Sequence, residues 1–106
     1  MARNLWHKKL SDMIKLCRSK GISVKFVPDS RTRDYIGMNP EAAKAIGFKM
    51  PAHTFFVDRN LSTEDKYETL KHELIEYEQM KNNHLKYFPA HCVALDAEDK
   101  VTEQGC

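Results

Sequence analysis

The apolar residues in the first fifth of the chain recur with the spacing of one face of a helix. They fall at i, i+4, i+7, i+8 and i+11, and the basic residues between them lie off this stripe. Gly21 then takes the usual place of a glycine just beyond a helix end. The pattern predicts a helix over residues 4–19, with a core-facing stripe of Trp6, Leu10, Met13, Ile14 and Cys17.

Three shorter segments have the composition of strands. Residues 22–27 alternate apolar and polar side chains over most of their length and are rich in β-branched residues, which predicts a strand with one buried face. Residues 33–38 form a weaker candidate, and residues 53–58 a third strand rich in aromatic and β-branched residues. The turn at Pro28 separates the first two.

Helix starts are marked at three further points. Asn39, followed by proline and an acid, caps a short helix. Ser62 caps a longer helix with acids in its first turn, and this helix runs to about residue 81. Pro89 suits the first turn of a last helix over roughly residues 88–98.

These elements describe one small domain covering residues 1–106, with no repeat and no linker. Their order is helix, two strands, short helix, strand, helix, helix. We therefore expect an α+β fold in which a three-stranded sheet packs on the N-terminal helix and the long helix, followed by a C-terminal helix.

Charge is distributed unevenly along the chain. Residues 1–33 carry nine basic and two acidic side chains, a balance of +7, and residues 34–106 carry eight basic and thirteen acidic ones, a balance of −5. The basic third could contact nucleic acid weakly, or an acidic partner. The alternative is a solvated helix face, and Trp6 supports it because this aromatic lies on the buried stripe, away from the basic face.

Targeting signals are not apparent in the chain. No apolar run approaches the ~18 residues of a membrane span, and no apolar signal-peptide core follows the basic start. We expect a cytoplasmic protein with no membrane partner. The three cysteines are far apart and form no Cys-x-x-Cys pair, so a thiolate zinc site is not expected.

The candidate chemistry lies on the long helix. Its apolar stripe is formed by Tyr67, Leu70, Leu74 and Tyr77. His72 and Glu76 share a different face, and at i and i+4 their Cβ atoms are ~5–6 Å apart. An imidazole nitrogen and a carboxylate oxygen can then meet at one ion at ~2.0–2.2 Å. Glu73, one residue further round the helix than His72, can reach the open side of this ion without binding it.

A catalytic zinc ion needs a third protein ligand, and two histidines with one glutamate form a known set. His91 is the best candidate because it lies in the next helix, after a short turn. His84, within that turn, is second, and His53, before a strand, is third. Nitrogen and carboxylate ligands together favour Zn²⁺ over magnesium.

The stretch from His53 to Glu98 resembles the zincin superfamily of metallopeptidases, in its gluzincin-type branch. Zincins place an edge strand before a helix bearing His-Glu-x-x-His, and a following helix supplies the third ligand. This chain has the strand and the His72-Glu73 start, but Glu76 stands where the family has histidine. With Glu76 as the carboxylate ligand and His91 as the second histidine, the ligand set is unchanged.

The resemblance implies a zinc-dependent hydrolase, a minimal metalloprotease acting on a peptide or protein substrate. Glu73 would be the general base that activates a metal-bound water, and Tyr87, one turn before His91, would stabilise an oxyanion. A chain of this length has little material for a cleft wall, so substrates would be short or a homodimer would complete the cleft.

Two other interpretations remain open from the sequence. One is a catalytically inactive zincin-like domain that binds protein or nucleic acid, and the other is a structural metal site without an open coordination position. The long helix also carries an acidic run, and such runs usually form solvated faces. The run comprises Glu64, Asp65, Glu68, Glu73, Glu76 and Glu78.

Overall fold

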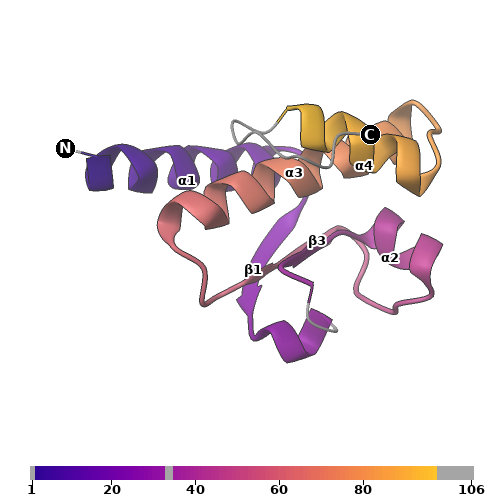
Figure 1. Cartoon of the computed structure of the whole chain (residues 1–106), viewed down its shortest axis with the longest axis horizontal. Helices are drawn as coiled ribbons and strands as arrows, with labels where there is room; N and C mark the ends of the chain where they lie inside the picture. The colour runs from indigo at the N-terminus through magenta and orange to yellow at the C-terminus, as the bar shows by residue number, and fades with distance from the viewer. Residues whose placement is uncertain (1, 33–34, 98–106) are drawn as a thin grey trace.

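The computed structural model of the chain describes residues 2–32 and 35–97. Helices α1, α3 and α4 lie together on one side of a small sheet (Figure 1). The order of elements and the α+β class agree with the sequence-based prediction. The elements are α1 (Ala2–Ser19), β1 (Ser23–Val27), a 3₁₀ turn η1 (Asp29–Thr32), β2 (Gly37–Met38), α2 (Pro40–Ile46), β3 (Thr54–Asp58), α3 (Thr63–Asn82) and α4 (Tyr87–Asp96).

The three strands form a mixed sheet with β3 in the middle. The order is β1-β3-β2, with β1 parallel to β3 and β2 antiparallel to it. β2 is only two residues long, shorter than the strand expected over residues 33–38, and residues 33 and 34 of that expectation lie outside the described part of the chain. Among the described residues, β2 is therefore an edge strand of the sheet.

The main core fills the space between the sheet and the helices. Phe55 and Val57 of β3 are fully buried against Leu70 and Leu74 of α3. Cys17 at the end of α1 closes the same cluster. The apolar stripes predicted for the two long helices therefore face each other and the sheet.

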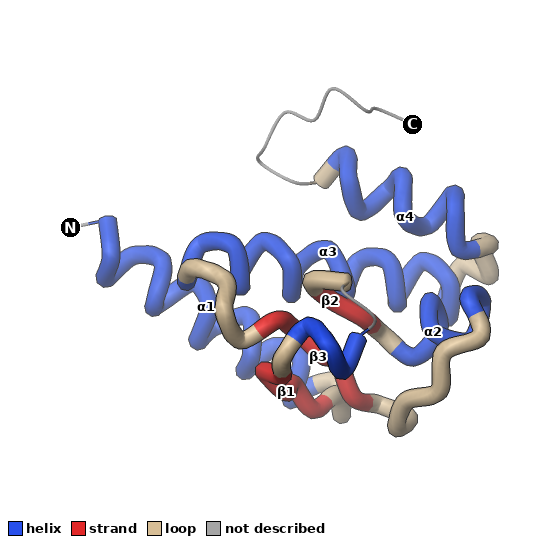
Figure 2. Tube along the Cα trace, turned by 60° about the horizontal axis from the view of Figure 1, so that its bottom comes forward, coloured by secondary structure: helices blue, strands red, loops and turns tan. Residues whose placement is uncertain are grey.

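α3 is the central helix of the molecule. It lies between α1 and α4, as the tube in Figure 2 shows. On the α1 side the rings of Trp6 and Tyr67 are 5.8 Å apart, and Tyr77 packs edge-on against Phe55. A second cluster around Met38 and Ala42 fills the space on the side of β2 and α2.

The second cluster explains why the acidic run of α3 is not a solvated face. Glu68, Glu73 and Glu76 are each at most 6% exposed. The expectation of a solvated acidic face is wrong for these three residues because β2, α2 and α4 cover the side of α3 that carries them. α3 is thus buried on an apolar face and on a polar face.

Among the helices of the described residues, none is both long enough and apolar enough to cross a bilayer.

Candidate metal centre

His72 and Glu76 lie on α3, whose start is capped by Ser62. The Ser62 hydroxyl accepts a hydrogen bond from the Asp65 backbone N–H (3.1 Å), and α3 then continues unbroken to Asn82. One turn apart near the middle of this helix, His72 Nε2 and Glu76 Oε2 are separated by 3.1 Å. Both side chains are buried, at 10% and 3% exposure.

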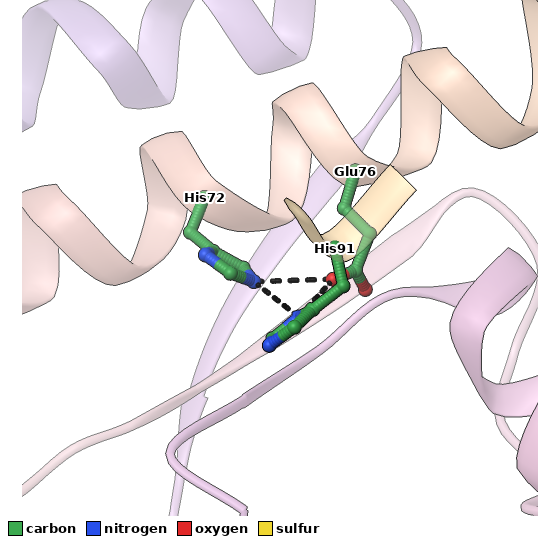
Figure 3. Close-up of side chains that lie close together, drawn as sticks. All are labelled: His72, Glu76 and His91. Carbon is green, nitrogen blue, oxygen red and sulfur yellow. Dashed lines mark hydrogen bonds and ion pairs between the residues drawn. The ribbon is translucent and has the colours of Figure 1, made fainter. Parts of the chain in front are cut away.

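His91 reaches the pair from α4. The chain reverses between α3 and α4 through a turn in which the Leu85 N–H donates to the Gln79 carbonyl and His84 takes a positive φ of 57°. The reversal lays α4 along α3. His91 Nδ1 then lies 2.8 Å from Glu76 Oε2 and 3.1 Å from His72 Nε2. Figure 3 shows the three side chains pointing at one another.

The three facing atoms have the spacing and chemistry of a metal site. Ligand atoms of a tetrahedral zinc ion, each ~2.0–2.2 Å from the metal, lie roughly 3.3–3.6 Å apart. The observed separations of 2.8 to 3.1 Å are a few tenths of an ångström shorter, so a small opening of the side chains admits an ion. The contact between His72 Nε2 and His91 Nδ1 also requires that at least one nitrogen carries no proton, as a metal ligand must. These residues could therefore hold a metal ion.

Three histidines were candidates for the third ligand, and the structure brings one of them to the site. His91 completes the cluster with His72 and Glu76. His84 and His53 are exposed, and both have a positive φ of 57° in turns. Neither belongs to the cluster.

A cavity of about 500 Å³ opens beside the cluster. Its wall contains the three clustered residues and also Glu73, whose carboxylate comes from the same face of α3. The His91 side chain is 32% exposed, so the cluster is closed on the helix side and accessible on the cavity side.

Tyr87, the predicted oxyanion donor, lies in the same wall. Its ring is 5.6 Å from the His91 ring, inclined by 31°. Burial, followed by the nearby charges of Glu76 and Glu73, raises the pKa of Tyr87 to about 12. The hydroxyl therefore keeps its proton at neutral pH and remains a hydrogen-bond donor.

Asn39 is a site residue that the sequence did not reveal. Its amide nitrogen donates to Glu73 Oε1 and to Glu76 Oε1, both at 3.0 Å. The sequence indicated only its role as a helix cap, which the structure confirms through a 2.9 Å bond from the Ala42 N–H to Asn39 Oδ1. No local pattern could have found the other contacts, because Asn39 is 34 and 37 residues away from these glutamates.

Comparisons with protein-family models, with curated proteins and with solved structures found no match for this chain. The geometry of the cluster and its cavity is therefore the basis for a functional proposal.

Proposed function

We propose that this protein is a zinc-dependent hydrolase, a minimal zincin-like metallopeptidase. The observation that carries the proposal is the convergence of two imidazole nitrogens and one carboxylate oxygen at an open cavity that is also lined by a further carboxylate, that of Glu73. A structural zinc site would be closed by four protein ligands, whereas catalytic sites keep one position open. Among the described residues the cluster has three members.

The proposed roles follow from where each side chain lies. His72, Glu76 and His91 would hold the ion, which when bound acts as a Lewis acid and lowers the pKa of a coordinated water to about 7. Glu73 would accept the proton of the attacking water and deliver it to the leaving amine. Tyr87 would donate a hydrogen bond to the oxygen on which negative charge develops.

A peptide substrate is favoured by the strand beside the cavity. The backbone N–H of Asp58 donates to the Ile36 carbonyl (2.8 Å), so Ile36 and Asp58 lie in the register of a hydrogen-bonded pair of the antiparallel ladder. Hydrogen-bonded and non-bonded pairs alternate along an antiparallel ladder, so the backbone N–H and C=O of Gly37 point away from β3, to the outer edge of β2. Gly37 also lines the cavity. An extended peptide pairing with this edge would pass next to the metal cluster.

Metal analysis and a single isosteric variant test the proposal. Protein purified without added metal should contain or take up about one zinc per chain. Glu73→Gln should keep the metal and the fold, and should lower cleavage of a quenched peptide library by ~10²–10⁴-fold, because an amide cannot accept the proton.

Each alternative outcome has its own meaning. Absence of zinc uptake contradicts the metal centre. Equal cleavage by the wild type and by Glu73→Gln contradicts the role of Glu73. Zinc bound in both proteins without cleavage by either favours a structural metal site or an inactive binding domain.

A further inference from the structure

We propose that Asn39 is a positioning residue that keeps Glu76 as the metal ligand and Glu73 as the base. The inference rests on the proposed metal site and assigns different roles to its two glutamates. It is carried by a single buried amide that contacts both carboxylates.

The two carboxylates need a donor between them. Glu73 and Glu76 are three residues apart on α3, and both are nearly inaccessible to solvent. Like charges at this spacing repel, and buried carboxylates are unfavourable unless they are hydrogen-bonded. The two hydrogens of the Asn39 amide match the two Oε1 atoms, each at 3.0 Å.

These bonds select which oxygen of each carboxylate remains for chemistry. Glu76 Oε1 is engaged by Asn39, so Oε2 alone faces His72 and His91. In Glu73, Oε1 accepts the hydrogen bond from Asn39, and Oε2 lies close to Gly37. A Cβ atom added to Gly37 would be only 3.1 Å from this Oε2. Glu73 is thereby held on the β2 side of the cavity and is kept from becoming a fourth ligand.

Asn39 is itself fixed in orientation. Its Oδ1 accepts the Ala42 N–H at the start of α2, and the residue is completely buried. A flipped amide would turn its oxygen toward two carboxylates and its NH₂ toward an N–H group, which is unfavourable on both sides. The start of α2 is therefore the anchor from which the two glutamates of α3 are aligned.

The test must separate this alignment from the capping of α2. Asn39→Ser and Asn39→Gly both remain acceptable helix caps, but neither carries an amide that can reach the glutamates. Ser62→Ala is the matched control, because it removes the cap of α3 ten residues before the first residue of the cluster. Each protein is titrated with Co²⁺, whose visible absorption reports the coordination number, and folding is followed by circular dichroism.

The wild type and Ser62→Ala should bind one Co²⁺ with the same spectrum. Asn39→Ser and Asn39→Gly should bind it ~10-fold or more weakly, and with an altered spectrum, because the carboxylates are no longer oriented. An unchanged affinity and spectrum in both Asn39 variants would overturn the inference while leaving the metal centre intact. Unfolding of both, with Ser62→Ala still folded, would overturn it in favour of a purely structural role. No Co²⁺ uptake by the wild type would overturn the metal centre and this inference together.

Discussion

Glu76 is a charged side chain at a position that ordinarily belongs to the core. It is 2% exposed, and its two oxygens meet three partners, Asn39, His72 and His91. Buried ionisable groups rarely add net stability compared with apolar residues of similar size. Their presence on a helix that already buries a full apolar stripe is typical of a binding or catalytic site.

Removing any one of the clustered residues should weaken zinc binding. His72→Ala, Glu76→Ala and His91→Ala would each remove one of the three proposed ligands, so each should reduce zinc affinity by ~10-fold or more. Competition with a chromophoric chelator measures this. His84→Ala serves as the control, because His84 is exposed in the turn before α4. A loss at His84 equal to the loss at His91 would contradict the ligand assignment.

Cys17, in contrast to Glu76, is a buried side chain that carries no charge. Burial, with a smaller effect from Glu78, raises the pKa of the thiol from 9.0 to about 11. Because the folded pKa lies above the unfolded one, the thiol contributes stability below pH 9, and this contribution is lost as the pH rises toward 11. At pH 8 iodoacetamide should therefore modify Cys17 only when the protein unfolds, as peptide mass spectrometry with and without urea would show. Rapid modification of the folded protein would contradict its burial.

At the scale of the elements, hydrophobic periodicity predicts the bounds of a helix or strand well where that element packs one face on the core. α1, β1, β3 and α3 lie within two residues of their predicted bounds for this reason. The pairing of β1 with β3 and the two-residue length of β2 could not be predicted, because strand partners are selected by tertiary contacts. The burial of the acidic face of α3 was missed for the same reason.

The close approach of β2 to α3 depends on the absence of a side chain at residue 37. A Cβ atom there would lie 2.6 Å from Thr69 Cγ2 and 3.1 Å from Glu73 Cγ. Gly37→Ala should therefore destabilise the protein by ~1–3 kcal/mol, as overpacking does, and should displace the Glu73 carboxylate. Urea denaturation measures the first effect and peptide cleavage the second.

The double variant Gly37→Ala/Thr69→Ser provides the control. Serine lacks the methyl group that the new Cβ would meet most closely, so the double variant should recover most of the lost stability. If Gly37→Ala alone is as stable as the wild type, then β2 and α3 are not as close as described.

At the scale of the whole molecule, the site is assembled from three segments. The start of α2 supplies Asn39, α3 supplies three site residues, and α4 supplies His91 and Tyr87. The sequence could indicate His91 because a short turn between two helices forces them to be neighbours. It could not indicate Asn39, since nothing local shows that α2 begins against the polar face of α3.

The metal should matter most for α4, which supplies one of the three clustered residues. Only Ala90 and Ala94 of this helix are buried, whereas Phe88 is 68% exposed. Because His91 alone belongs to α4 among the clustered residues, a bound ion would link this helix to α3. Zinc at 100 times its Kd should stabilise the fold by about 2.7 kcal/mol and raise Tm by ~10–20 °C.

Removal of the zinc with a chelator should reverse this stabilisation and should speed hydrogen exchange in α4 more than in α1 or β3. His91→Ala should exchange like the chelated wild type, with no further response to chelator. Equal acceleration in every element would contradict a specific link to α4, since the ion would then support the entire fold.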